Sequence, residues 1–219
     1  AVAAVSISKS SFTDNTVTSS ASSAGSYGGA LCFCEGFVSM ELGDIAISQS
    51  VFSGNTATAT GSSSGAFGGG IYTDEIDSIA ITNSTISGNK ASGASKSLGG
   101  GLFVKELDAD DNLDGMKLSF VTIANNSVSG ATTNTGGGFY SEHSVATSQS
   151  YAFINVLIAD NSSTGTSPDC SSSDSIQSYG YKPNSLFTTE PVFSHRPDFI
   201  TQAKGGYVYY IHDHLATPQ

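Results

Sequence analysis

The sequence predicts an all-β protein, a right-handed parallel β-helix of about five coils with three short strands in each coil. Two observations lead to this prediction. Two short motifs alternate along the chain, the first returning every 34 to 40 residues, and apolar residues alternate with polar ones before each copy of the first motif. A motif that returns at such a period is the signature of a solenoid, and alternation with period two indicates strands with one buried face.

The first motif is a small or β-branched residue followed by Phe or Ile, two small or polar residues, and Asn. It occurs at residues 10–15, 50–55, 84–89, 121–126 and 156–161. Its Asn residues are 40, 34, 37 and 35 residues apart. Unequal steps between fixed motifs indicate loop insertions, which a solenoid tolerates because its loops face solvent.

Two ladders are expected from this motif, because coils stack about 4.8 Å apart. The first is an internal apolar ladder of Phe12, Phe52, Ile86, Ile123 and Ile158. The second is a ladder of Asn15, Asn55, Asn89, Asn126 and Asn161. We expect each Asn at a tight bend, since Asn tolerates left-handed backbone and its amide can bond the next coil.

The second motif is glycine-rich and falls at residues 28–31, 68–71, 99–102 and 136–139. Its paired glycines are Gly28, Gly29, Gly68, Gly69, Gly99, Gly100, Gly136 and Gly137. We expect them where the chain re-enters the sheet, at a corner where a Cβ would clash or where φ must be positive.

These repeats resemble those of a known family. The FxxN and GGA(I/L) repeats resemble the polymorphic outer-membrane adhesins of the autotransporter type, and ISGNxAxxxGGGIY resembles the wider class of bacterial right-handed β-helix proteins. PDC at 168–170, followed by SIQSYGY, resembles the segment that closes the last coil in that class. The resemblance covers residues 4 to about 181, and it implies the fold and an extracellular or cell-surface location.

The domain organisation follows from where the repeats end. We expect a β-helix over residues 1–181 and a C-terminal tail over residues 182–219, either an added strand or a linker. Residues 209–219, YYIHDHLATPQ, resemble a signature of Rhs/YD-repeat proteins, although one residue is missing before Asp213 and Ala216 replaces Gly. That resemblance implies a link to a large secreted polypeptide. The alternative is that YVYYI is a strand that packs across a sheet.

Charge and composition exclude several classes of function. The chain has 8 basic and 19 acidic side chains and a net charge of -11, so nucleic acid and anionic membranes are not expected partners. No apolar run is long enough to span a membrane. Low charge with much Gly, Ser, Thr and Asn is typical of secreted β-rich proteins, so we expect an extracellular or cell-surface protein.

Some β-helices cleave polysaccharides, which requires paired carboxylates or a calcium cluster with a basic residue. Asp110 and Asp111 are adjacent and fall in a polar loop, and they have no basic companion. His212 and His214 flank Asp213, and together with His143 and His195 they are expected to be solvated rather than metal-bound. No G-x-S-x-G motif is present, so the sequence predicts that the chain is not an enzyme. Ice binding is not expected either, because the Thr residues fall in irregular loops.

One loop has the oxygen ligands that calcium prefers. Asp108, Asp110, Asn112 and Asp114 stand at alternate positions before Gly115. The alternative is a solvated acidic loop without cofactor, since the distal Glu of such sites is lacking. Asp74, Glu75 and Asp77 occupy the comparable place one coil earlier, where they would repel one another without a cation.

The three cysteines do not indicate a disulfide framework. Residues two apart on a strand, as Cys32 and Cys34 are, rarely bridge, so we expect Cys32, Cys34 and Cys170 to act as small buried hydrophobic residues.

The function expected from the sequence is structural or adhesive. The chain would be a module of a surface protein or a fibre subunit that stacks end to end with itself or binds a host-cell or matrix surface. The alternative is a carbohydrate-binding or polysaccharide-degrading domain, in which Tyr72, Phe103 and Tyr140 would form a stacking stripe beside carboxylates.

Overall fold

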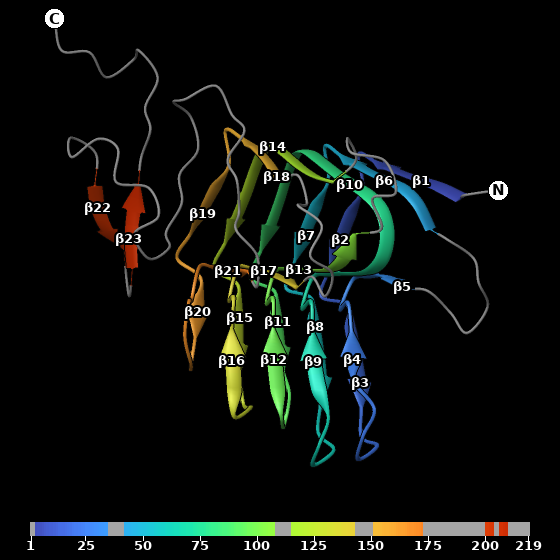
Figure 1. Ribbon diagram of the computed structural model, residues 1–219, viewed down its shortest axis with the longest axis vertical. Coiled ribbons are helices and arrows are strands. Elements are labelled where there is room, and N and C mark those ends of the chain that lie inside the picture. The colour runs from blue at the N-terminus through green and yellow to red at the C-terminus, as the bar shows by residue number, and fades with distance from the viewer. Residues whose placement is uncertain are drawn as a thin grey trace, which may run out of the picture.

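The computed structural model describes residues 3–34, 42–107, 115–142, 151–172, 200–203 and 206–209. It confirms the predicted fold, because stacked parallel strands wind into a β-solenoid (Figure 1). The described part of the chain is all-β and contains no helix long and apolar enough to cross a membrane.

Each coil passes through a series of short strands. The first coil contains β1 (Ala3–Ser8), β2 (Ser11–Thr13), β3 (Thr16–Ser19), β4 (Ser26–Tyr27) and β5 (Leu31–Cys34). The second and third contain β6 (Leu42–Ser48), β7 (Val51–Ser53), β8 (Thr56–Ala59), β9 (Gly65–Phe67), β10 (Ile71–Ser87), β11 (Lys90–Ser92), β12 (Lys96–Leu98) and β13 (Leu102–Leu107). The last two contain β14 (Met116–Ala124), β15 (Ser127–Ser129), β16 (Thr133–Thr135), β17 (Phe139–Glu142), β18 (Tyr151–Ile154), β19 (Leu157–Ala159), β20 (Ser162–Ser163) and β21 (Cys170–Ser172).

The strands stack into three parallel sheets. The largest has 12 strands and follows the order β1-β6-β10-β13-β17-β21, with β2, β5, β7, β14, β18 and β19 joined to it. The second sheet follows β20-β15-β11-β8-β3, and the third follows β16-β12-β9-β4. Four steps separate the five strands of the second sheet, so the described chain makes about 4 turns. β22 (Ile200–Ala203) and β23 (Gly206–Tyr209) form a separate antiparallel pair.

The coil has more strands than the three expected. The Ser/Thr-rich stretches that read as loops form the second and third sheets, in strands of two to four residues such as β8 and β9. Thr56 and Thr58 therefore lie on a regular strand beside Thr16 and Thr18 of β3, and the expectation that these Thr residues fall in irregular loops was wrong.

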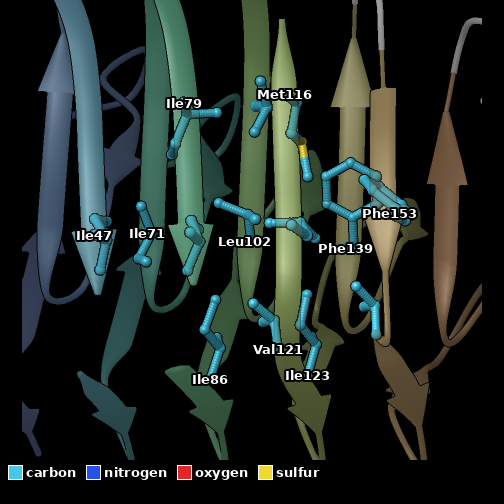
Figure 2. Packing of buried hydrophobic residues seen from close by; sticks show 14 of the residues in the cluster. Ile47, Ile71, Ile79, Ile86, Leu102, Met116, Val121, Ile123, Phe139 and Phe153 are labelled. Atoms are coloured by element: carbon cyan, nitrogen blue, oxygen red, sulfur yellow. The ribbon is translucent and has the colours of Figure 1, made fainter. Parts of the chain in front are cut away.

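Apolar side chains fill the interior in columns that run along the axis (Figure 2). Ile45, Ile79 and Met116 are register partners in one column, and all three are buried. Burial of one such side chain contributes about 1.5–3 kcal/mol. Because the column repeats in every coil, each coil covers the apolar face of its neighbour, and the stack is stabilised as a unit.

The glycine pairs serve two different steric needs at one corner. Gly68 has a left-handed backbone with φ of 62°, where any other residue would be strained. Gly69 has no room for a side chain, because its Cβ would collide with the carbonyl oxygen of Gly100 in the next coil. Gly99 and Gly100 repeat the same division, with φ of 62° at Gly99 and the carbonyl oxygen of Gly137 against Gly100.

Candidate functional site

A ladder of asparagines joins all the coils at the bend between the first and second sheets. The backbone N–H and the Nδ2 of each Asn donate to the Oδ1 of the Asn in the next coil, at 2.8 to 3.0 Å. The rungs are Asn15, Asn55, Asn89, Asn126 and Asn161. From Asn55 onward, Nδ2 also donates to a backbone carbonyl of the preceding coil, at 2.9 to 3.0 Å.

The ladder ends on a carboxylate. Oδ1 of Asp169 accepts from the backbone N–H and from Nδ2 of Asn161, both at 3.1 Å. Asp169 is buried, and it belongs to the same coil as Asn161. Its side chain therefore stands where the Oδ1 of a sixth Asn would be, so the ladder is closed at this end.

The bend itself differs from the sequence-based expectation. The left-handed residue is the one before each Asn, with φ of 55° at Asp14 and 67° at Gly54, while the Asn residues themselves do not have positive φ. The amide is thus free to point along the axis, because the preceding residue makes the turn. The expected left-handed Asn was wrong, although the expected bond to the next coil is present.

The apolar ladder expected from the same motif lies in the core. Phe12, Phe52, Ile86, Ile123 and Ile158 are successive register partners. The rings of Phe12 and Phe52 stack with centroids 4.9 Å apart. All members except Phe12 are fully buried.

A second polar ladder, of serines, was not foreseen from the sequence. The backbone N–H of Ser10 donates to Oγ of Ser50, and that of Ser50 donates to Oγ of Ser84, both at 3.1 Å. Val121 and Val156 replace the serine in the last two coils. The sequence feature that could have predicted this ladder is the first residue of the first motif, which is Ser in three copies and Val in two.

The proposed stacking stripe is mostly a packed cluster. Tyr72, Phe103 and Tyr140 follow one another on the outer face of β10, β13 and β17, with centroid separations of 5.2 and 5.1 Å. Leu98 and Phe67 of the third sheet pack against them, and Tyr72 and Phe103 are only 3% and 1% exposed. Buried rings cannot stack on a sugar. Tyr27, which is 40% exposed, still offers an accessible ring for such a contact.

A charged cluster lies beside the aromatic one. Nζ of Lys105 contacts both carboxylate oxygens of Asp74 at 2.8 and 3.0 Å, and the Tyr72 hydroxyl donates to the same carboxylate at 3.0 Å. Burial, with the nearby Asp74 charge, raises the pKa of Tyr72 well above its ordinary value. The ammonium group of Lys105, from the next coil, therefore offsets the negative charge of Asp74.

Several sequence-predicted residues lie outside the described residues. They include the proposed calcium ligands Asp108, Asp110, Asn112 and Asp114, and also Asp111 and His143, His195, His212 and His214. Within the described ranges no group of three or more His, Cys, Asp or Glu side chains is close enough to hold a metal ion.

The cysteines differ from the expectation at one end of the chain. Cys32 and Cys34 are joined by a disulfide on the exposed face of β5, whereas they were expected to be buried. Cys170 is buried in the apolar core, as expected. The two cysteines lie on an edge strand, which has no further described strand beyond it.

Together the fold and its ladders define a parallel β-solenoid whose asparagine ladder ends, among the described residues, on the carboxylate of Asp169. No protein family, curated protein or solved structure matches the chain significantly. The function is therefore inferred from the geometry of the solenoid.

Proposed function

We propose that the chain is a non-enzymatic structural or adhesive module of a secreted or cell-surface protein. The observation that carries the proposal is the continuous ladder from Asn15 to Asp169, which links every described coil by side-chain hydrogen bonds. Side chains at the repeated positions pack and bond along the axis. Such an arrangement produces a stiff rod that presents its outer faces to partners.

Two further features support an extracellular setting. A disulfide such as Cys32–Cys34 persists in oxidising compartments and is rare in the cytosol. The net charge of -11 keeps such a rod soluble and disfavours binding to nucleic acid and to anionic membranes. The similarity of the repeats to polymorphic outer-membrane adhesins belongs to the same proposal, with a host-cell or matrix surface as partner and self-association through the coil edges.

The test is a binding assay with the full chain on beads. Beads that carry the folded chain are compared with beads that carry chemically unfolded chain, for binding to cultured cells and to purified matrix proteins. In a separate assay, acidic and neutral polysaccharides are incubated with the folded chain in the presence of calcium. Binding that requires the folded chain, with no new reducing or unsaturated sugar ends, supports the proposal. Release of such ends, or equal binding by unfolded chain, contradicts it.

A second candidate is carbohydrate binding without cleavage. It is favoured by exposed Tyr27 and half-buried Tyr140, which flank the aromatic cluster next to Asp74 and Lys105. A glycan array separates the two functions. If the chain binds glycans, Tyr27→Ala should abolish the glycan signal. Phe120→Ala removes an exposed ring from another strand and should leave that signal intact.

A further inference from the structure

The Cys32–Cys34 disulfide closes a loop across a single residue, Phe33. The stabilisation that a disulfide gives to a fold grows with the length of the loop that it closes, so this bond contributes little to stability. The strand that carries the bond is held in another way, because all four residues of β5 are register partners of residues in β10. The disulfide is therefore not required as a clamp.

The two bonded cysteines lie on the outer face of the solenoid. Cys32 and Cys34 are exposed, whereas Leu31 and Phe33, on the other face of the strand, are partly buried and pack against the core. Cys170, the third cysteine of the chain, is 2% exposed in the interior. A reagent in solution therefore reaches the disulfide and not Cys170.

The position of Cys34 faces solvent also in coils that have a neighbour on each side. Its register partners in the next two coils are Asp74 and Lys105, and their side chains are 23% and 33% exposed. The partners of the other cysteine, Tyr72 and Phe103, are only 3% and 1% exposed. Cys34 is thus the cysteine that another protein can approach from the side of the solenoid.

We infer that Cys32 and Cys34 form a thiol–disulfide exchange site, which attaches a cysteine of another protein reversibly. This chemistry goes beyond the structural or adhesive role and does not depend on it. The thiolate of the incoming cysteine attacks Sγ of Cys34, so that a new S–S bond forms and the bond to Cys32 breaks. The electron pair of the broken bond stays on Sγ of Cys32, which leaves as a thiolate and takes up a proton from water.

The reverse reaction releases the attached protein. Once deprotonated, Cys32 attacks Sγ of Cys34, expels the incoming cysteine as a thiolate and restores the original disulfide. One disulfide replaces another in each direction, so the exchange consumes no oxidant or reductant. The only co-reactant is a protein thiol.

Charge around the site selects which thiol reacts. The carboxylate of Asp74 is offset by Lys105, but the next residue of β10, Glu75, is exposed, and the whole chain has a net charge of -11. The attacking thiolate is itself an anion. Basic residues beside it favour its approach to an acidic protein and also favour ionisation of its thiol. The expected partner is therefore a cysteine flanked by Lys or Arg.

Reaction of the full chain, purified without reductant, with a peptide that has Lys on both sides of one cysteine tests the inference. Samples are quenched with N-ethylmaleimide, which traps released thiols. Mass spectrometry should find one peptide on Cys34 and one maleimide on Cys32, and removal of the peptide before the quench should return the unmodified chain. Absence of this adduct from the folded chain overturns the inference, and so does a chain purified with three thiols.

A second peptide, with Glu in place of Lys, tests the choice of partner. Rates are divided by the thiolate fraction of each peptide, so that only the approach to the protein is compared. The Lys peptide should react about threefold faster or more at low salt, and high salt should remove the difference. Equal rates at low salt overturn the selection of a basic partner.

Variants separate the site from the rest of the chain. The double variant Cys32→Ser, Cys34→Ser should take up no peptide. Its circular dichroism spectrum and its urea unfolding midpoint should match those of the unchanged protein, because β5 is held by its register with β10. Cys170→Ala is the matched control and should react like the unchanged protein. Adduct formation by the double variant, or loss of its fold, overturns the inference.

Discussion

At the residue scale, asparagine is the side chain that lets one coil bond the next. Its Oδ1 accepts two donors from the preceding coil, while its Nδ2 donates both backward and forward along the axis. An aspartate offers the acceptor but no donor. This explains why the four inner rungs are Asn and why Asp169 stands only at the end, where nothing further needs to be donated to another rung.

Removal of an inner rung is expected to be costly. In Asn89→Ala the buried donors of Asn55 lose their acceptor, and each buried group left without a partner costs about 1–3 kcal/mol. We expect the free energy of unfolding in urea to fall by about 3 kcal/mol or more. Asn15→Ala, at the exposed end of the ladder, should cost clearly less. Equal losses in the two variants would contradict the role of the ladder.

Phe120 is an exposed aromatic residue in a strained backbone. It has φ of 56° and its side chain is 58% exposed, while the residues at the same bend in the neighbouring coils are Asn83 and Asn155. Left-handed backbone costs an ordinary L-residue about 1–2 kcal/mol, and Asn tolerates it better. Phe120→Asn should therefore raise the free energy of unfolding by about 1 kcal/mol. The reverse change, Asn83→Phe, should lower it, and a loss of stability in Phe120→Asn would show that the ring is needed.

At the element scale, glycines at two different bends of the coil meet two kinds of steric demand, Gly100 at the corner of paired glycines and Gly88 at the bend before Asn89. Gly100→Ala puts a Cβ against the carbonyl oxygens of Gly137 and Ser127, which belong to the next coil. Gly88→Ala meets no atom closer than 3.7 Å and suffers only from its φ of 67°. We expect about 1 kcal/mol of destabilisation for Gly88→Ala and at least twice that for Gly100→Ala. Chemical denaturation measures both, and the reverse order would contradict the assigned close approach.

The strand β10 also carries a group whose protonation is coupled to folding. Folding raises the pKa of Tyr72 above its ordinary value of 10.0, through burial and the Asp74 charge. Above that pH the unfolded chain loses the proton and the folded chain keeps it, so stability is full below pH 10 and falls as pH rises beyond it. Unfolding free energies from about pH 9 to about pH 11 should decline less steeply in Tyr72→Phe than in the unchanged protein. Equal slopes would contradict the burial of this hydroxyl.

The sequence predicted some elements well and others poorly, for physical reasons. The core strands were predictable because apolar residues such as Ile45 and Ile47 alternate with polar ones. A strand with one buried face requires this alternation in its sequence. The second and third sheets were not, because TATA of β8 and GAF of β9 are too short to show a period. The resemblance of PDC at 168–170 to a closing segment pointed to this part of the chain, but the contact of Asp169 with Asn161 forms only once the coil has closed, and no local pattern specifies it.

At the scale of the whole molecule, an acidic rod should respond to salt. A net charge of -11 destabilises the compact state by self-repulsion, and salt screens that repulsion over a Debye length of about 8 Å at physiological ionic strength. The melting temperature should therefore rise with added sodium chloride. Calcium chloride and magnesium chloride, compared at equal ionic strength, should raise the melting temperature by the same amount. A larger rise in melting temperature with calcium than with magnesium would contradict the expectation that the chain has no cofactor. It would point to the proposed calcium ligands between residues 108 and 114.

The central claim is that the asparagine ladder runs through the interior of the solenoid, with Asn15 as the one exposed rung among the described coils. The most direct measurement is hydrogen exchange of the side-chain amide protons by nuclear magnetic resonance on labelled protein. The account predicts that the Nδ2 protons of Asn55, Asn89 and Asn126 exchange about a hundredfold more slowly than those of Asn15. Exchange at one common, solvent-like rate for all of them would contradict the ladder and the solenoid built on it.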